Sequence, residues 1–287
     1  MSQDKLQAQR FELKYIISEE VALAVRDFVS SYLEIDEFGA TLPNLSYPVH
    51  SLYLDSPDMK LYKSTINGDK NRFKLRLRFY ENRADAPVFF EIKRRMNNTI
   101  SKQRGGVRRD GVEGLLAGQL PNPNHLVSKE PKQLVALQNF CRLLSNLEAS
   151  PKAHIAYLRE AWISRYDNSV RVTMDRNVRC DPEPSARLST EMIQPVTVFG
   201  NKVVLELKFT NRFPDWFKEL VRVFGLMQCG AAKYVDGVTL VGENVVTRAF
   251  AFDDLPQTAR IPAHQARSAT APAADKISEP GLSALTK

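Results

Sequence analysis

The segment from Arg72 to Tyr80 constrains the fold most, because charged and apolar residues alternate along it without a break. Successive side chains of a strand point to opposite faces, so this alternation predicts a strand with one apolar and one wholly cationic face. Same-face side chains recur about every 6.6 Å, so the cations repel one another unless water or an anion compensates them. Taken alone, the cationic face is interpreted as a solvated sheet surface, with a polyanion-binding surface as the alternative. The cationic residues are Arg72, Lys74, Arg76 and Arg78.

Six further segments alternate in the same way and predict a mainly antiparallel sheet. The segment 88–94 follows the cationic strand after a short connection, which predicts a hairpin. Its Glu91-Ile-Lys93 pattern recurs as Glu206-Leu-Lys208, and Arg10-x-Glu12-x-Lys14 resembles both. The predicted strands, besides the cationic one, cover residues 10–17, 50–55, 88–94, 156–163, 170–175 and 203–209.

Four segments are predicted to be helices that cover the apolar faces of these strands. Ser18 is predicted to cap a helix that continues to Tyr32, and Ser56-Pro57 to begin a short helix that ends before Asn67. A packing helix is predicted over residues 132–147. A further amphipathic helix is predicted to begin at Pro214 and to end at Gly230.

The remaining segments are predicted to be connections and tails. Residues 94–109 are rich in Arg and Lys and are interpreted as a basic loop. Residues 111–130 show no hydrophobic period and are interpreted as a linker. We predict a flexible N-terminus at residues 1–9 and a disordered tail, rich in Ala, Pro, Ser and Thr, at residues 255–287.

The composition favours an anionic partner and argues against several kinds of site. The 287 residues carry a net charge of +7, which favours nucleic acid, a lipid surface or a phosphate compound. Three cysteines without CxxC spacing and four scattered histidines argue against a zinc site or a disulfide frame. No run of about 18 apolar residues occurs, so no transmembrane segment is expected. We predict a soluble protein with a cytoplasmic location.

The charged faces of these strands predict a closed arrangement. An antiparallel sheet curled into a barrel would bring the charged faces into one lumen while helices cover the apolar faces. Such a lumen is costly when empty, because burying an unpaired ion costs several kcal/mol. The arrangement becomes reasonable when a polyanion and a divalent cation occupy the lumen, with carboxylates on the metal and Lys and Arg on phosphate oxygens.

Seven short motifs also occur in a characteristic order. They are Arg10-Phe-Glu-Leu-Lys-Tyr15, Ser51-Leu-Tyr-Leu-Asp-Ser56, Lys74-Leu-Arg-Leu-Arg-Phe-Tyr80, Glu91-Ile-Lys93, Arg171-Val-Thr-Met-Asp175, Leu205-Glu-Leu-Lys208 and Lys233-Tyr234. In these motifs the chain resembles the VTC domain, the polyphosphate polymerase domain of the vacuolar transporter chaperone, within the triphosphate tunnel metalloenzyme (CYTH-like) superfamily. The resemblance implies an α+β domain over residues 10–250, with an eight-stranded antiparallel β-barrel tunnel, a charged lumen and flanking helices. It also implies transfer of the ATP γ-phosphate to a growing polyphosphate chain, with Mn²⁺ or Mg²⁺.

The resemblance further implies roles for individual residues. Glu206 is implied to be the leading metal ligand, with Glu12 and Glu91 as secondary candidates, and the basic segment 94–109 is implied to lie near a tunnel mouth. The residues implied to be catalytic are Arg76, Arg78, Lys93 and Glu206. The residues implied to bind substrate phosphates are Lys14, Lys74, Arg76, Arg78, Lys93, Arg159, Arg171, Lys208 and Lys233.

Two alternatives to the polymerase stay open: a triphosphatase acting on inorganic or nucleoside triphosphate, and a noncatalytic polyphosphate-binding module. Arg10 stands where the wider superfamily carries a glutamate, which supports polymerisation better than hydrolysis. The expected ligands are ATP and polyphosphate. Nucleic acid is not expected, because the strands display no aromatic stacking platform between their cations. Asp175 ends a predicted strand and is interpreted as a turn residue. Repulsion along the cationic face predicts that Arg76→Ala leaves the ligand-free protein as stable or more stable.

Overall fold

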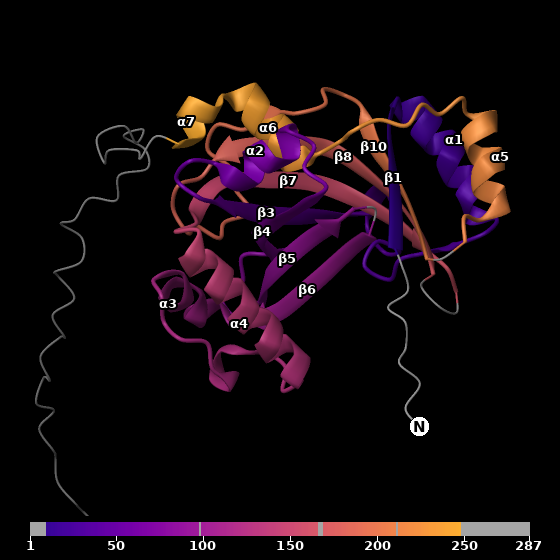
Figure 1. Ribbon diagram of the computed structural model, residues 1–287. Coiled ribbons are helices and arrows are strands. Elements are labelled where there is room, and N and C mark those ends of the chain that lie inside the picture. The colour runs from indigo at the N-terminus through magenta and orange to yellow at the C-terminus, as the bar shows by residue number, and fades with distance from the viewer. Residues whose placement is uncertain (1–9, 98, 166–168, 211, 248–287) are drawn as a thin grey trace, which may run out of the picture. The chain divides into compact units, whose positions relative to one another are not determined.

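The computed structural model describes residues 10–97, 99–165, 169–210 and 212–247. Within them the chain forms one large antiparallel sheet with helices packed on it (Figure 1). This arrangement confirms the predicted α+β class. The N-terminus at residues 1–9 and the tail at residues 255–287 lie outside the described residues, so both stay predictions.

The sheet comprises ten strands among the described residues, and all pairs of neighbouring strands are antiparallel. The main path runs β1-β10-β8-β7-β3-β4-β5-β6, with the short β2 beside β7 and the short β9 beside β8. The strands are β1 Arg10–Ile17, β2 Glu34–Ile35, β3 Ser46–Asp55, β4 Asn71–Phe79, β5 Val88–Met96, β6 Thr99–Val107, β7 Ser150–Ile163, β8 Val170–Pro182, β9 Val196–Thr197 and β10 Val203–Thr210.

Helices α1 to α4 lie between these strands in the chain, and α5 to α7 follow the last strand, β10. Ser18 caps α1 as predicted, since its Oγ accepts a hydrogen bond from the backbone N–H of Val21 at 3.4 Å. The α-helices are α1 Glu19–Ser30, α2 Lys60–Ile66, α3 Val112–Leu116, α4 Pro131–Asn146, α5 Asp215–Val223, α6 Lys233–Val241 and α7 Glu243–Thr247, and the 3₁₀ turns are η1 Pro43–Leu45, η2 Arg109–Gly111 and η3 Pro123–His125.

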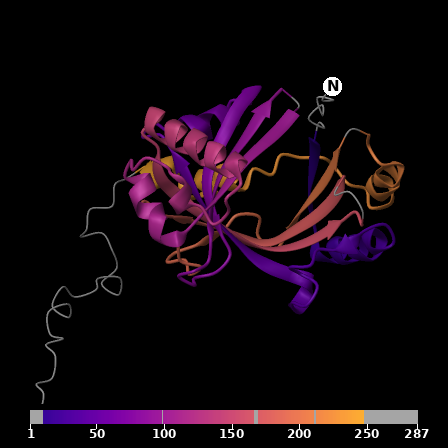
Figure 2. The same ribbon diagram turned by 90° about the horizontal axis from the view of Figure 1, so that it is seen from below.

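The sheet curls, but it does not close into the predicted barrel. Its two edge strands, β1 and β6, lie side by side in both views (Figures 1 and 2). No backbone ladder joins them within the described residues, so the strand path remains open at this seam. Side chains span the seam instead: the Nζ atom of Lys93 on β5 lies 3.0 Å from the Glu12 carboxylate on β1. The prediction of a closed eight-stranded barrel is therefore wrong in its closure.

Helices cover the outer, apolar face of the curled sheet at both ends, as predicted. At one end α1 and α5 bury Val25 and Phe217 against Leu205 and the neighbouring strands β1, β10 and β8. At the other end α3 and α4 bury Phe140 against Leu77 and the strands β4 to β6. Each fully buried side chain of this size contributes about 1.5–3 kcal/mol. These two cores hold the strands with their charged faces turned to the concave side.

The concave face is not charged along its whole length. At one end α2 and α6 pack into it, and the ring of Tyr234 on α6 stacks on Tyr53 of β3 with centroids 4.7 Å apart. Val49, Ile155 and Val204 complete this third core. The predicted charged lumen is thus confined to the part of the concave face that α6 leaves open.

The basic segment 94–109 is mostly strand rather than the predicted loop. Strand β5 continues to Met96, Asn97 turns the chain with a φ of 51°, and β6 pairs back along β5. Gly105 and Gly106 let α4 and its preceding loop approach the end of β6 closely. A Cβ on Gly105 would lie 2.9 Å from the Gln133 backbone oxygen. These two glycines therefore serve the close packing of a strand.

Several predicted boundaries also differ from the structure. The helix expected at Ser56-Pro57 begins at Lys60, although Ser56 still accepts a hydrogen bond from the Lys60 N–H at 2.9 Å. Helix α5 ends at Val223, before the left-handed Gly225, and not at Gly230. The segment 111–130, predicted to be a linker, contains α3 and η3. Strands β3, β7 and β8 are longer than predicted, because pairing with their neighbours extends them through segments without clear alternation.

Candidate functional site

The candidate site is the open, charged part of the concave face, to which the eight strands of the main path and helix α6 contribute side chains. Strand alternation turns these side chains inward, while the apolar residues between them enter the outer cores. Two groups of residues can be distinguished. The carboxylate cluster consists of Glu12, Lys14, Arg159, Asp175, Glu206, Lys208 and Lys233, and the arginine cluster consists of Ser51, Tyr53, Arg76, Arg78, Glu91, Lys102, Arg104 and Tyr157.

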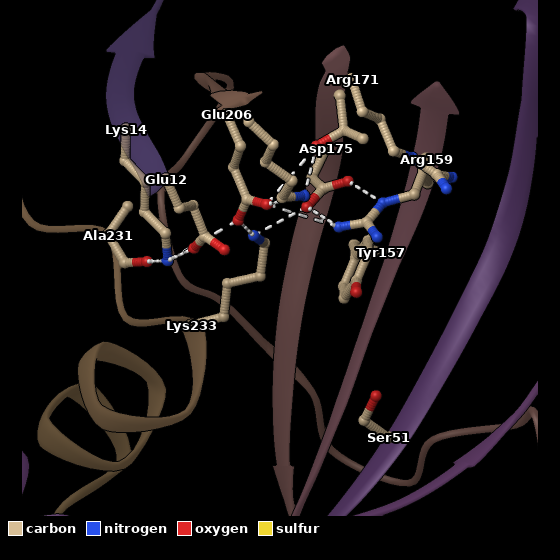
Figure 3. A network of polar contacts seen from close by, with 12 residues as sticks. Glu12, Lys14, Ser51, Tyr157, Arg159, Arg171, Asp175, Glu206, Ala231 and Lys233 are labelled. Atoms are coloured by element: carbon tan, nitrogen blue, oxygen red, sulfur yellow. Dashed lines mark hydrogen bonds and ion pairs between the residues drawn. The ribbon is translucent and has the colours of Figure 1, made fainter. Parts of the chain in front are cut away.

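Lys233 connects two buried acids at the centre of the carboxylate cluster (Figure 3). Its Nζ atom lies 2.7 Å from Asp175 Oδ2 and 2.9 Å from Glu206 Oε1. Lys233 is the first residue of α6, so the packing of that helix into the concave face brings the ammonium to the strands. Arg159 on β7 holds Asp175 through two hydrogen bonds of 2.7 and 2.8 Å. This fork fixes the carboxylate geometrically.

Further cations surround Glu206 from neighbouring strands. Lys208 Nζ lies 2.5 Å from Glu206 Oε2. Lys14 Nζ lies 3.6 Å from Glu206 Oε1 and 3.3 Å from Glu12 Oε1, and it donates a hydrogen bond of 2.7 Å to the Ala231 carbonyl (Figure 3). Lys93 reaches Glu12 across the seam. The cluster thus joins both sides of the seam through ion pairs.

The electrostatics of the cluster keep its carboxylates ionised. Burial opposes ionisation of Glu206, but Lys208, Lys233 and Lys14 hold its pKa well below the usual range. Burial likewise opposes ionisation of Asp175, and Arg159 and Lys233 lower its pKa. Burial lowers the pKa of the Lys208 ammonium to about 8, although Glu206 opposes this shift. The acids are therefore charged at neutral pH, while Lys208 lies near its titration range.

The arginine cluster is built from β3, β4, β5 and β6. Arg76 donates to the fully buried Glu91 carboxylate at 2.7 Å and to the Tyr53 hydroxyl at 3.0 Å. Arg78, only 6% exposed, donates to Ser51 Oγ at 3.2 Å and to the Tyr157 hydroxyl at 2.9 Å. Within the described chain no carboxylate lies within ion-pair distance of Arg78, so its charge is buried with neutral partners.

Strand β6 adds two cations that the sequence prediction placed in a loop. Lys102 Nζ lies 2.6 Å from Glu91 Oε1, and the Arg104 guanidinium lies over the Phe89 ring, 3.5 Å from its centroid. Both were missed as site residues. The spacing could have revealed them, because Lys102 and Arg104 are two residues apart and therefore point to the same face of a strand.

Cations outnumber carboxylates on this face. Lys74 has no carboxylate within ion-pair distance among the described residues, and burial, with Lys14 and Lys93 nearby, lowers its pKa to about 8. Burial opposes ionisation of Tyr53, but Arg76, Lys74 and Arg78 lower its pKa to about 7. Both shifts report a strongly positive local field. Such a field attracts anions with several charges.

The structure places the predicted residues in different parts of the face. Lys14, Arg159, Lys208, Lys233, Glu12 and Glu206 meet in the carboxylate cluster, and Arg76, Arg78 and Glu91 in the arginine cluster. Lys93 and Lys74 lie between the two. Arg171, near the start of β8 and opposite Lys208 in the register, is bound to Asp36 at 2.7 Å and to none of the carboxylates of the two clusters among the described residues.

Asp175 is not the turn residue that the sequence suggested. Strand β8 continues to Pro182, so Asp175 lies within the strand, fully buried and bound to Arg159 and Lys233. Its two partners come from another strand and from helix α6, and local alternation cannot reveal them. Ser51, Tyr53 and Tyr157 were missed for the same reason, although the alternation of Ser51 and Tyr53 along a predicted strand indicated a common face.

The carboxylates of Glu206 and Glu12 fit a hard divalent cation better than Glu91 does. Both direct an oxygen at the ammonium of Lys14, so a cation position already exists between them. Carboxylate oxygens are the ligands that Mg²⁺ and Mn²⁺ favour. Glu91 is bound by Arg76 and Lys102 in the other cluster. Among the described residues no group of three or more His, Cys, Asp or Glu side chains forms a ready metal site.

Comparison with known proteins identifies the family. The fold and the site define a curled antiparallel sheet with a charged concave face. The family model of the VTC domain matches residues 9–241 of this chain. The chain therefore belongs to the VTC domain family, which confirms the resemblance seen in its motifs. A comparison with curated proteins finds no match.

Three solved structures show a distant likeness. A protein from Pyrococcus horikoshii has 14% sequence identity and a TM-score of 0.43, with 81% of this chain and 99% of that chain covered. Two proteins described as putative adenylate cyclases also match. The one from Bacillus halodurans has 14% sequence identity and a TM-score of 0.43, with 78% of this chain and 94% of that chain covered. The one from Vibrio parahaemolyticus has 11% sequence identity and a TM-score of 0.39, with 79% of this chain and 97% of that chain covered. In the part of the chain that the structure describes, no helix is long and apolar enough to cross a membrane.

Proposed function

We propose that this chain is a metal-dependent polyphosphate polymerase that transfers the γ-phosphate of ATP to a growing polyphosphate chain on the concave face. The observation that carries the proposal is the excess of inward-facing cations, above all Arg78 and Lys74, which have no carboxylate partner among the described residues. A buried excess charge costs stability unless an anion compensates it. Membership of the VTC domain family supports phosphate compounds as that anion.

The residues of the site can supply what phosphoryl transfer needs. This reaction needs little covalent chemistry from the protein; it needs in-line positioning and stabilisation of negative charge. Arg76 and Arg78 present guanidinium groups from one strand, and a guanidinium fork matches two phosphate oxygens. Lys93 and Lys74 lie between the two clusters and can bind the phosphates that connect them. No nucleophilic side chain is required.

Glu206 and Glu12 are the residues that would hold Mn²⁺ or Mg²⁺. The cation would supply neutralisation of charge on phosphate oxygens. Lys14, Lys208 and Lys233 now neutralise these acids, so the same ammonium groups would become available to phosphate when a divalent cation takes over the carboxylates. Through this exchange of partners, binding of the divalent cation to the carboxylate cluster would favour binding of phosphate to the same lysines.

The test is an assay of the purified chain with ATP, Mn²⁺ and a short polyphosphate primer. We expect ADP and long-chain polyphosphate from the wild type and from the matched control Arg83→Gln. Arg83 is exposed, and among the residues that the structure describes its ion pairs are with Glu81 and Asp85 in the β4–β5 connection. Glu206→Gln should lower the rate at least about tenfold, because it removes a carboxylate ligand of the cation that would neutralise the phosphate oxygens. Wild-type protein that makes neither product would overturn the proposal.

Product analysis distinguishes the alternatives. Orthophosphate without polyphosphate would identify a triphosphatase acting at the same residues. A noncatalytic polyphosphate-binding module also has an observation in its favour, because every carboxylate of the carboxylate cluster already has an ammonium or guanidinium partner. Such a module would bind polyphosphate without turnover, and its affinity would survive Glu206→Gln.

A further inference from the structure

The tip of the β5–β6 hairpin, beside the first residues of β4, carries a basic hollow outside the two clusters. Its volume is about 350 Å³, and it is lined by Gly68, Lys70, Arg72, Arg95 and Asn97. Three of the five lining residues are cationic and none is acidic. The Asn97 N–H donates to the Lys70 carbonyl at 3.0 Å, so a backbone hydrogen bond beyond the last strand pair holds the two sides of the hollow together.

Strand register places two of these cations against each other. Arg72 is directly opposite Arg95 in the β4–β5 pair, an arrangement that is destabilising for like charges. Arg72 donates to the Asp69 backbone carbonyl, and Arg95 donates to the Asn97 carbonyl at 2.8 Å. Neither guanidinium has a carboxylate within ion-pair distance among the described residues. The remaining N–H groups are available to an anion in the hollow.

The hollow continues the charged face of the site. Arg72 lies two residues before Lys74 and Arg95 two residues after Lys93, so both point to the same face as these inward-facing residues. The next row of the register is Lys74, Lys93 and Lys102, and the row after it is Arg76, Glu91 and Arg104. Successive rows are about 7 Å apart. A positive path therefore leads from the arginine cluster to the end of the hairpin, and its outermost row has no acid on its own strands.

We propose that this hollow, the hairpin-tip site, binds the part of a polyphosphate chain that extends beyond the arginine cluster. The identity of the ligand rests on the proposed function. Guanidinium groups bind phosphate oxygens in pairs, and a linear chain presents phosphates repeatedly along its length. A chain held in the arginine cluster reaches the hairpin tip at a high effective concentration, so long chains gain affinity that short ones cannot. The site thereby makes binding depend on chain length.

Binding of two ligands to the full chain without ATP tests this inference. Tripolyphosphate is the short ligand and long-chain polyphosphate the long one. The Arg72→Gln/Arg95→Gln double variant should lose about tenfold in affinity for the long ligand, and the salt dependence of that binding should fall by roughly two counterions. Its affinity for tripolyphosphate should equal that of the wild type. Arg83→Gln, in the connection at the other end of the same strand pair, is the matched control and should change neither affinity.

Equal losses for both ligands, or no loss for either, would overturn the hairpin-tip site. Should the double variant fail to fold, Lys70→Gln outside the strand replaces it, with the same length-dependent loss expected. The two proposals fail separately. A length-dependent loss in a protein that makes no polyphosphate would reject the polymerase and retain the hairpin-tip site. Polyphosphate synthesis without a length-dependent loss would reject the hairpin-tip site alone. A wild type that binds neither ligand would reject both.

Discussion

At the scale of single residues, Arg76 and Arg78 show how neighbours decide the role of a charge. They lie two positions apart on β4 and point to the same face. Arg76 neutralises Glu91, a carboxylate with no exposed surface, whereas Arg78 is buried against the hydroxyl groups of Ser51 and Tyr157. Removing the first charge leaves a buried acid with fewer partners, and removing the second relieves an uncompensated cation.

This difference predicts opposite effects on stability. Arg76→Met should lower the free energy of unfolding by about 3–5 kcal/mol, the usual cost of breaking a buried ion pair. Arg78→Met should leave the ligand-free protein as stable or more stable. Urea denaturation of both variants without ligand measures the two values. The structure thus reverses the sequence-based expectation for Arg76 and transfers it to Arg78.

Polyphosphate binding provides the control for this pair. Both variants should lose affinity for tripolyphosphate, because both guanidinium groups face the site. An Arg78→Met variant that is strongly destabilised would contradict the view that its charge is kept for a ligand. Equal stability of Arg76→Met and wild type would show that Lys102 and Arg104 suffice for Glu91.

Lys74 predicts a pH dependence of stability. Burial lowers its pKa from 10.5 to about 8 in the folded protein. Between these values the unfolded chain binds the proton and the folded chain does not, so the free energy of unfolding rises with pH from about 8 to 10.5. Lys74→Met should remove its part of this rise. Denaturation at several pH values measures it, with the exposed Lys218→Met as the control.

Tripolyphosphate should flatten the same pH dependence, since a bound anion favours the ammonium form and raises the pKa of Lys74. A wild-type slope that is unchanged by both Lys74→Met and the anion would contradict this account of the residue.

At the scale of elements, helix α6 determines whether the carboxylate cluster forms. Lys233 at its first residue binds Asp175 and Glu206, and the helix approaches β8 closely at Gly237. A Cβ at Gly237 would lie 2.7 Å from Cys180 Cβ and 3.2 Å from Ile155 Cδ1. Only glycine permits this distance between helix and sheet, so a packing contact on one turn positions a charge on another.

Gly237→Ala should therefore act on the site from a distance. We expect a loss of about 1–3 kcal/mol from overpacking, together with weaker tripolyphosphate binding as Lys233 moves. Leu240→Ala on the same helix, where the side chain is 56% exposed, is the matched control and should change neither quantity. Thermal unfolding and titration with the anion measure the two effects. Unchanged binding in a destabilised Gly237→Ala protein would separate α6 packing from the site.

At the scale of the whole molecule, the open seam and the excess of inward cations have one common consequence. The ligand-free sheet holds like charges close together without a closing ladder between β1 and β6. Compensation of those charges by an anion should stabilise the entire described domain, because the affected strands β1, β4, β5, β6 and β10 belong to one sheet.

Tripolyphosphate at about 100 times its Kd should raise the free energy of unfolding by about 2.7 kcal/mol, which corresponds to roughly 5–10 °C in Tm. Sodium chloride at equal ionic strength should give a much smaller shift, since it screens exposed charges more than buried ones. Differential scanning calorimetry measures both. An equal shift from the two salts would indicate general screening and no anion site.

The sequence predicted well those features that depend on neighbouring residues. The inward and outward faces of β1, β4, β5 and β10 followed from alternation, which a one-residue shift would invert. The order of the motifs indicated the VTC domain family, and the family match confirms it. Strand β6 and the ends of β7 and β8 were missed. Glycines, prolines and polar residues on both faces weaken the alternation in these segments. Pairing with neighbouring strands stabilises them instead.

The sequence by itself determined which residues carry charge toward a common face and which family that pattern belongs to. Only the tertiary structure decided how those charges are partnered. It placed Asp175 inside a strand between Arg159 and Lys233, and it separated Glu91 from Glu206. Helix α6 fills one end of the concave face, and the seam between β1 and β6 stays open. The physical reason is distance along the chain. Alternation acts over two residues, whereas ion pairing and sheet closure depend on segments that meet only after folding.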